Sequence, residues 1–235
     1  MKLVLKVGGS IFENPTIFDR FFDVFLDSLD SNTSYIFLAG GGKECDILRQ
    51  EYLSQSKIRK EEDYFHWKAI EIMDKNAEKL KLRVESLSKT ELISNIEEIN
   101  NPGIYFLKPF HDLRNLDPLE HSWNVTSDSI SLFYAYKARS SLCVFIKKEP
   151  YLTIGEIPIK RISCTKLNKY QNVQRTEEDL GKGFVDTISP HLSLKYQIPI
   201  LILNGSDPLV IANFFSKYQK EENILSRYGI EIYPQ

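Results

Sequence analysis

The sequence is poor in cysteine, has no long apolar run and carries no excess of either charge. Its three cysteines, Cys45, Cys143 and Cys164, are far apart, which fits reduced, buried thiols better than a disulfide framework. No Cys-x-x-Cys pair or His/Cys cluster suggests zinc. No stretch approaches the ~20 apolar residues of a membrane-spanning helix, and the apolar run after Met1 is too short for a signal peptide. These absences favour a cytoplasmic protein.

The charge balance excludes further classes of partner. Lys and Arg together number 30, Asp and Glu 32, and both signs are spread along the chain. A protein that binds nucleic acid or a membrane surface usually has a basic face or tail. We therefore expect neither partner.

Two common phosphate-binding signatures are also missing. There is no G-x-x-x-x-G-K-[ST] run, and no G-x-G-x-x-G follows the first apolar run. An ordinary P-loop enzyme and a dinucleotide-binding Rossmann protein are therefore disfavoured, and any phosphate must be bound by another glycine-rich design.

Such a design is present near the start of the chain, where five of the eleven glycines fall in two clusters. Gly8-Gly9 follows the apolar run Leu3–Leu5, with Lys6 between them, and Gly40-Gly41-Gly42 follows the run Tyr35–Leu38. A helical pattern follows each cluster. Glycine lets the backbone approach a phosphate closely, and a helix N-terminus attracts anions. The pattern indicates phosphate handling by an enzyme.

The rest of the chain predicts strands that alternate with helices. Asn14-Pro15 can open a helix whose phenylalanine stripe, Phe18–Phe25, has the period of a core face. Further helical patterns cover 43–55, 62–80, Ser127–Ala138 and Pro208–Tyr218, and short apolar runs lie at Ile104–Leu107, Leu142–Ile146 and Ile198–Leu203. This alternation predicts an α/β protein with a mainly parallel sheet. Tyr151–Lys160 suggests a hairpin, and the polar stretch Lys166–Lys182 a surface connection.

Three motifs in order resemble the amino acid kinase superfamily, which includes acetylglutamate, aspartate, uridylate and isopentenyl phosphate kinases. They are Lys6-Val7-Gly8-Gly9-Ser10, Ala39-Gly40-Gly41-Gly42 and Thr126-Ser127-Asp128-Ser129. The resemblance implies a three-layer α/β/α sandwich with a mainly parallel central sheet. It also implies one domain over 1–235, with an acceptor-binding half (about 1–125) and a nucleotide-binding half (about 126–235).

Two longer strings, His66–Asp74 and Ser122–Ile130, resemble the archaeal and methylotroph branch of aminomethylfuran phosphate kinases of methanofuran biosynthesis. Val185-Asp186 and Leu203–Pro208 resemble late elements of that branch. By this resemblance the cofactors are ATP and Mg²⁺, the partners are ATP and a small molecule, and the chain forms a homo-oligomer.

The sequence departs from the family at two places. Many members of the family have a lysine and then a valine-aspartate-glycine turn after the fifth strand, whereas the sequence here is Ile146-Lys147-Lys148-Glu149-Pro150. The usual C-terminal Gly-Thr is also missing. These departures keep open a nucleotide-binding sensor without turnover.

Catalysis of phosphoryl transfer requires positioning and charge neutralisation more than covalent chemistry. Lys6, a compact cation at a strand end, is assigned to bridge phosphate oxygens. By resemblance Asp128 holds the catalytic lysines, although Ser127-Asp128 also suits a helix cap. We assign Lys148 as the second catalytic cation and Lys147 as a nucleotide contact, with Lys166 as a further candidate. A solvated strand end is the alternative for both lysines.

The remaining candidates divide between the two substrates. Gly8, Gly9, Ser10 and Ser127 are assigned to the nucleotide, with helix capping as the alternative for Ser10. Gly40, Gly41, Gly42, His66, Lys68 and Trp123 are assigned to the acceptor. A surface position is the alternative for His66 and Lys68, and the core is the alternative for Trp123. No protein metal ligand is assigned, and His111, His121 and His191 receive no role.

The expected function is ATP-dependent phosphoryl transfer to an anionic acceptor. A phosphomonoester such as aminomethylfuran phosphate is preferred over another small acid or phosphate, such as an acylglutamate, UMP or isopentenyl phosphate. A scaffold that pairs through the aromatic stretch Phe18–Phe25 is a third class.

Overall fold

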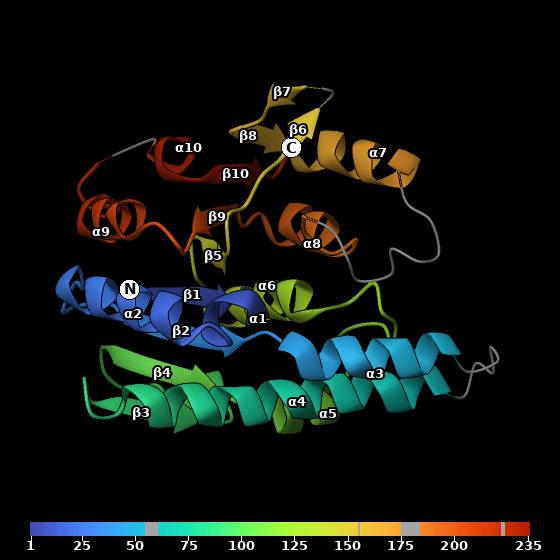
Figure 1. Ribbon diagram of the computed structural model, residues 1–235, viewed down its shortest axis with the longest axis horizontal. Helices are drawn as coiled ribbons and strands as arrows, with labels where there is room; N and C mark the ends of the chain where they lie inside the picture. The colour runs from blue at the N-terminus through green and yellow to red at the C-terminus, as the bar shows by residue number, and fades with distance from the viewer. Residues whose placement is uncertain (55–60, 155, 175–183, 222–223) are drawn as a thin grey trace.

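An eight-stranded sheet forms the centre of the computed structural model, which describes residues 1–54, 61–154, 156–174, 184–221 and 224–235 (Figure 1). The strand order is β3-β4-β2-β1-β5-β9-β10-β8. The strands are β1 (Lys2–Val7), β2 (Ser34–Ala39), β3 (Thr90–Ile93), β4 (Gly103–Leu107), β5 (Cys143–Lys147), β8 (Arg161–Ser163), β9 (Ile200–Asn204) and β10 (Ile230–Tyr233). Only the β9–β10 pair among the sheet's ladders is antiparallel. The predicted mainly parallel sheet is confirmed.

Helices cover both faces of this sheet. Buried side chains of α5 (Phe110–Leu116), α6 (Ser127–Lys137), α7 (Cys164–Gln174) and α8 (Ser189–Tyr196) join one apolar cluster. Those of α1 (Gly9–Phe12), α2 (Pro15–Asp27) and α9 (Pro208–Lys217) join a second cluster on the other face, and partly buried side chains of α10 (Leu225–Tyr228) pack against it. The long α4 (Glu61–Val84) contributes to both clusters and packs against α3 (Gly42–Ser54). The expected three-layer α/β/α sandwich is confirmed.

The phenylalanine stripe of α2 belongs to the core. Asn14 caps this helix by accepting a hydrogen bond from the Ile17 N–H at 3.2 Å, with Pro15 at its first position. The four stripe phenylalanines, Phe18, Phe21, Phe22 and Phe25, are each at most 1% exposed. Phe25 packs edge-on against Phe37 of β2 at a ring distance of 5.2 Å. The stripe is therefore unavailable for the interface of a scaffold protein.

The chain reverses its direction of travel across the sheet at β1. From β1 it moves to β2, then to the edge strand β3 and back to β4, all on one side, whereas β5 and β9 extend the sheet on the other side. In open parallel sheets such a reversal leaves a crevice at the carboxyl ends of the strands, because successive connections diverge there. Both glycine clusters lie at this edge, directly after β1 and β2.

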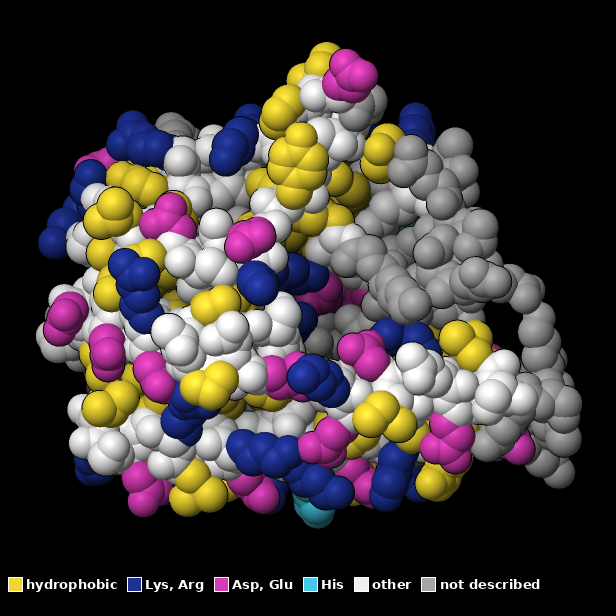
Figure 2. All heavy atoms as spheres, viewed as in Figure 1, with side chains coloured by type: hydrophobic (Ala, Val, Ile, Leu, Met, Phe, Trp, Pro, Cys, Tyr) yellow, Lys and Arg dark blue, Asp and Glu magenta, His cyan; other side chains and the backbone are white. Residues whose placement is uncertain are grey.

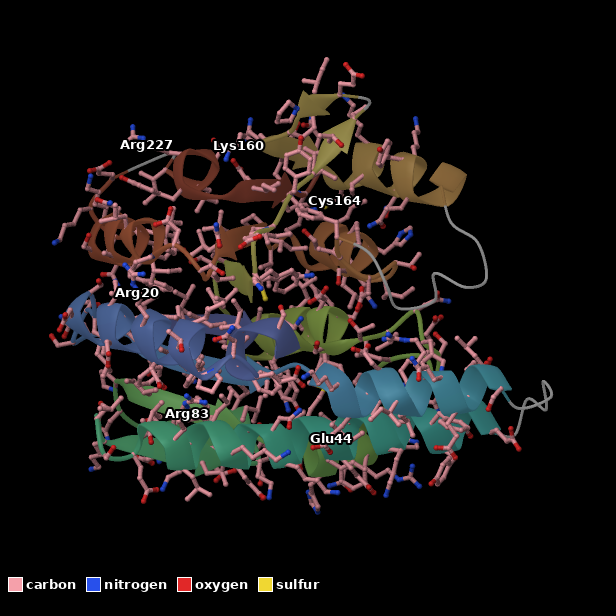
Figure 3. All side chains as sticks on the ribbon, viewed as in Figure 1. Arg20, Glu44, Arg83, Lys160, Cys164 and Arg227 are labelled. Atoms are coloured by element: carbon pink, nitrogen blue, oxygen red, sulfur yellow. The ribbon has the colours of Figure 1, made fainter. Side chains whose placement is uncertain are left out.

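The segment after residue 150 differs from its prediction. The hairpin is present, with β6 (Thr153–Ile154) antiparallel to β7 (Ile157–Pro158). The surface connection predicted for 166–182 is wrong at its start, because α7 runs to Gln174; residues 175–183 lie outside the described part. Cys164 opens this helix beside β8 and, with Leu167, is fully buried (Figure 3). About one buried side chain per turn, at Cys164, Leu167 and Gln171, anchors α7 where the overall polarity of the sequence suggested a loop.

The sequence patterns did not predict several short elements, namely β3, the 3-10 helix Ile96–Glu98, α5, α8, α10, β8 and β10. Each is shorter than the windows in which hydrophobic periodicity is informative. Among the described residues, no helix combines the length and apolarity that crossing a membrane would require.

Candidate active site

Two lysines from neighbouring strands point to the same face of the sheet. Along β1, Leu3, Leu5 and Val7 join the cluster on the α2 face, so Lys6 projects to the opposite, α6 face. Along β5, Cys143 and Phe145 lie on the α6 face, and the same alternation places Lys147 there.

Asp128, in the first turn of α6, lies between these two lysines. Its Oδ1 is 2.9 Å from the Lys6 Nζ, and its Oδ2 accepts a hydrogen bond from the Lys147 Nζ at 2.9 Å. Asp128 is 4% exposed and Lys6 8%. Burial alone would raise the pKa of Asp128, but the Lys147 and Lys6 ammonium groups outweigh it and hold that pKa well below its usual range. Asp128 is therefore a carboxylate shared by two cations.

The start of α6 is anchored by another buried carboxylate, Asp186. Thr126 caps the helix, accepting a hydrogen bond from the Asp128 N–H, so the Asp128 side chain is free of capping. Asp186 accepts hydrogen bonds from the backbone and hydroxyl of Thr126, Ser129 and Ser189, at 2.5–3.0 Å. It thereby fixes the start of α6 against the start of α8. Lys147 is fixed from the same side, because its Nζ also donates to the Phe184 carbonyl at 2.6 Å.

The two glycine turns touch each other. A Cβ added to Gly9 would lie 2.4 Å from the Gly42 Cα, and one added to Gly40 would lie 3.4 Å from the Lys6 Cε. Asn76, buried on α4, donates its Nδ2 hydrogens to the carbonyls of Gly40 and Gly41 at 2.9 and 3.1 Å. The turns and the Lys6 amine thus share one small region at the end of β1.

Three backbone N–H groups of these turns are already engaged. Gly8 donates to the Ile146 carbonyl at 2.9 Å, and Gly40 donates to the Val7 carbonyl at 2.8 Å. The Glu13 carboxylate accepts the Lys43 N–H at 2.6 Å and lies against Gly42, whose φ is +60°. Gly8, which we assigned to the nucleotide, lines the cleft with its N–H already bonded to β5, because the sheet extends past the end of β1.

A cleft of about 620 Å³ opens beside these groups. Figure 2 shows a hollow near the middle of the viewed face, with acidic and basic side chains inside it. The predicted residues that line the cleft are Lys6, Gly8, Gly9, Ser10, Gly40, Gly41, Gly42, His66, Trp123, Ser127, Asp128, Lys147 and Lys148. The structure therefore brings together residues that lie more than 140 positions apart in the chain.

One part of the cleft combines aromatic rings with a buried arginine. Trp123, 8% exposed, packs against Tyr52 and Phe65, so it lines the cleft and belongs to a small core cluster at once. The Arg49 guanidinium carbon lies 5.0 Å from the centre of the Trp123 ring. The Arg49 Nε and the Trp123 Nε1 are buried with no hydrogen-bond partner among the described residues. This end of the cleft has unused hydrogen-bond donors.

Some predicted site residues lie elsewhere. Lys68 pairs with Glu71 at 2.8 Å and lines a separate outer cavity, so the structure does not bring it to the cleft. Lys148 is exposed at the rim of the cleft, and it is Lys147 that contacts Asp128. Lys166 is exposed on α7 and does not line the cleft. Ser10 caps no helix, since Gly8 holds the N-cap position of α1.

The sequence reasoning missed Arg49, Asn76 and Glu13, and it gave Asp186 no role. No spacing or motif marks the first three, because each acts through a partner distant in the chain. The preference for Lys147 over Lys148 did have a signal. Alternation along the run Leu142–Ile146 places only one of the two lysines on the same face as Phe145.

Neither a protein-family model nor a curated protein sequence matches this chain. Solved structures do resemble it. Uridylate kinase from Archaeoglobus fulgidus superposes with a TM-score of 0.65 at 16% identity, covering 99% of this chain and 100% of that one. UMP kinase from Ureaplasma parvum gives 0.63 at 12% identity, covering 99% and 98%. Aspartate kinase from Synechocystis gives 0.62 at 13% identity, covering all of this chain and 40% of that one. The chain therefore has the amino acid kinase fold.

Proposed function

We propose that this protein is an ATP-dependent kinase that transfers the γ-phosphoryl group to an anionic group of a small molecule. One observation carries the proposal: Lys6 and Lys147, held by Asp128, sit beside two abutting glycine turns at the edge of a cleft. Lys6 and Lys147 each contact one oxygen of Asp128, and both line the cleft. The oxygens of a phosphate chain bound there would give both ammonium groups a further anionic partner.

The proposed roles follow from the charges. Transfer breaks the bond between the γ-phosphorus and the bridging oxygen and forms a bond from that phosphorus to an acceptor oxygen, releasing ADP. Lys6 and Lys147 neutralise charge on the transferring group and the leaving oxygen. Asp128 orients both lysines. It does not act as a base, because an ionised acceptor has no proton to lose.

The residues present fit Mg²⁺ bound mainly through the nucleotide. Among the described residues, no group of three or more His, Cys, Asp or Glu side chains could hold a metal ion by itself. Mg²⁺ commonly takes one or two carboxylates, water and substrate phosphates, which requires no such cage. Asp128 would contact the Mg²⁺ ion through a water molecule, and the ion would screen the phosphate charges.

For the acceptor we favour a phosphomonoester, with aminomethylfuran phosphate as the first candidate. The support is the resemblance of the strings His66–Asp74 and Ser122–Ile130, together with the position of His66 and Trp123 in the cleft. Acylglutamate, UMP and isopentenyl phosphate are the alternatives, since one scaffold can serve several acceptors. The division into an acceptor half and a nucleotide half, the homo-oligomer and the cytoplasmic location belong to the same proposal.

The test is ADP release from ATP and Mg²⁺ with each of these acceptors, run with wild type and a Lys6→Ala variant. Release that depends on one acceptor and on Lys6 supports the proposal. ATP binding without turnover at high concentrations of every acceptor would instead favour the sensor function. Release that is independent of any acceptor and unaffected in Lys6→Ala would contradict the mechanism.

A further inference from the structure

His121, which has no role in the proposed chemistry, is held between two carboxylates. Its Nδ1 lies 2.8 Å from the Asp63 Oδ1 on α4, and its Nε2 lies 2.7 Å from the Asp117 Oδ1 at the end of α5. A neutral imidazole has one N–H and can donate to one carboxylate only. Both contacts together require the doubly protonated, positively charged ring.

The His121 ring stacks on His66. Their ring centres are 4.7 Å apart and their planes differ by 22°. Trp67 packs edge-on against both rings, at 5.0 Å from His66 and 4.9 Å from His121. His66 is 8% exposed and lines the cleft that contains Lys6 and Asp128. The stack thus connects the clamped ring on the outside to the active-site cleft.

Two positive rings at that separation would repel each other strongly in a partly buried site. The ring that keeps its charge is the one with carboxylate partners, so His66 is the neutral member of the pair. Burial and the His121 charge lower the pKa of His66 to about 4, against the smaller opposing effect of Asp117 and Asp63. Burial would lower the pKa of His121, but its hydrogen bonds to Asp63 and Asp117 outweigh that and raise it.

We propose that His121 is a positioning residue: clamped by Asp63 and Asp117, it keeps His66 uncharged and fixes its ring at the cleft. His66 then meets the acceptor as a neutral hydrogen-bonding group whose state is constant across physiological pH. Only the part concerning the acceptor rests on the proposed kinase function; the charge states of the two rings do not.

Other ionisable groups lie near the two histidine rings and also influence their charge states. On the outer side, Arg114 of α5 lies 4.6 Å above the Trp67 ring. The outer cavity next to His121 is also lined by Tyr64, Lys68 and Glu71 of α4. On the cleft side, Asp46 and Arg49 of α3 and Glu62 of α4 line the same space as His66. Of all these groups, only Asp63 and Asp117 hydrogen-bond to the His121 ring.

The direct test is an NMR titration of the histidine rings, which is practical because the chain has only four histidines. In wild type, the His66 signals should not move between pH 6 and 8, and His121 should remain protonated at neutral pH. In His121→Gln, the pKa of His66 should rise by at least about one unit toward the ordinary value of about 6.5. His111→Gln is the matched control, since His111 is exposed on α5 and should leave His66 unchanged.

Should His121→Gln fail to fold, the double variant Asp63→Asn/Asp117→Asn removes the clamp at two exposed side chains. It should let His121 titrate in the neutral range. A His66 that titrates near pH 6.5 in wild type, or whose pKa is the same in every variant, overturns the proposal.

A second readout uses the acceptor that supports turnover. The ratio of acceptor KM in His121→Gln to that in wild type should change between pH 5 and 7, where the variant's His66 titrates, while the KM for ATP stays constant. Taking the ratio cancels the ionisation of the acceptor itself. If this KM ratio does not change with pH, the proposed effect of His66 on acceptor binding is wrong. If wild type turns over no acceptor, the kinase function fails, and the NMR titration still decides the charge states.

Discussion

At the scale of single residues, the candidate active-site cleft is organised around a carboxylate that two ammonium groups share. Asp128 is one carboxylate for two ammonium groups, and all three side chains are at least four-fifths removed from solvent. Burying charged side chains is costly, and clusters of buried charges that face a cleft are typical of functional sites.

The first prediction concerns Lys6. In Lys6→Ala, Asp128 keeps Lys147 as a partner, so the fold should persist, whereas kcat should fall by about 10²–10³ because a charge contact to the transition state is lost. Steady-state kinetics and circular dichroism measure both. Lys160→Ala, which removes an exposed lysine that does not line the cleft, is the matched control (Figure 3). Retention of kcat within about threefold in Lys6→Ala would contradict the assigned role.

The second prediction separates two adjacent lysines. Lys147→Ala should lower kcat by a factor similar to that of Lys6→Ala, because it removes the other cation on Asp128. Lys148→Ala should change kcat by less than about threefold, since that side chain is exposed at the rim. If Lys148→Ala lowered kcat much more than Lys147→Ala did, Lys148 would be the second catalytic cation, as the sequence analysis assigned it.

At the scale of elements, the glycine turns that follow β1 and β2 contact each other and together form one part of the cleft lining. Neither turn has room for a side chain where they meet, at Gly9 and Gly42. The motif spacing predicted that these turns serve one site, and the structure places them in contact. Their engaged N–H groups could not be foreseen, because the partner Ile146 comes from a strand more than 130 residues away in the chain.

The third prediction tests that contact. Gly9→Ala should lower the free energy of unfolding by about 1–3 kcal/mol, because the new methyl group meets backbone that cannot move aside easily. It should also reduce kcat by separating the turns. Urea denaturation and steady-state assays measure the two effects. Gly103→Ala is the control, since its added Cβ lies 3.5 Å from the nearest atom, which is ordinary contact. Equal behaviour of the two variants would count against the tight contact.

The fourth prediction concerns the junction of α4 and α5. Burial raises the pKa of Asp74 to about 6, although its Oδ1 accepts the Phe110 N–H at 3.0 Å. A carboxyl whose folded pKa is raised favours folding when protonated, so its contribution to stability is lost as pH rises from about 4 through 6. Asp74→Asn should therefore stabilise the protein at pH 8, by about 1–3 kcal/mol, and have little effect at pH 4.

Thermal unfolding across this pH range measures the difference between Asp74→Asn and wild type. Asp19→Asn is a control of opposite sign, because a hydrogen bond from Arg83, on the outer surface of α4, lowers the pKa of Asp19 (Figure 3). That variant should lose stability at pH 8. A stabilisation by Asp74→Asn that is the same at pH 4 and pH 8 would rule out the ionisation as its cause.

At the scale of the whole molecule, the sequence predicted what is local and repeated. Apolar runs and the stripe of α2 predicted the α/β layers correctly. The site could not be predicted in this way. The lysines that contact Asp128 come from β1 and β5, the Asp186 carboxylate that anchors the start of its helix comes from the segment before α8, and only the folded sheet brings them together. The α7 helix was missed for a related reason: Leu167 is buried by its neighbours in space, while its neighbours in the chain are polar.

The position of the lysines on the sheet leads to the last prediction. Lys6 comes from the first half of the chain and Lys147 from the second, so the boundary between the paired strands β1 and β5, here called the seam, runs through the proposed reaction centre. In-line transfer requires donor and acceptor on opposite sides of the moving phosphoryl group, which puts one ligand on each side of this seam.

Hydrogen exchange should therefore give two separate footprints. A non-hydrolysable ATP analogue should slow exchange after β5 and β9, at residues 147–150 and 204–207, whereas the acceptor should slow exchange at 40–43 and 121–126. Each ligand alone should leave the other's segments unchanged, because the turn after β1 is the element that both share. If both ligands protected the same segments, donor and acceptor would compete for one side of the seam. In-line transfer at Lys6 would then be impossible, whatever the identity of the acceptor.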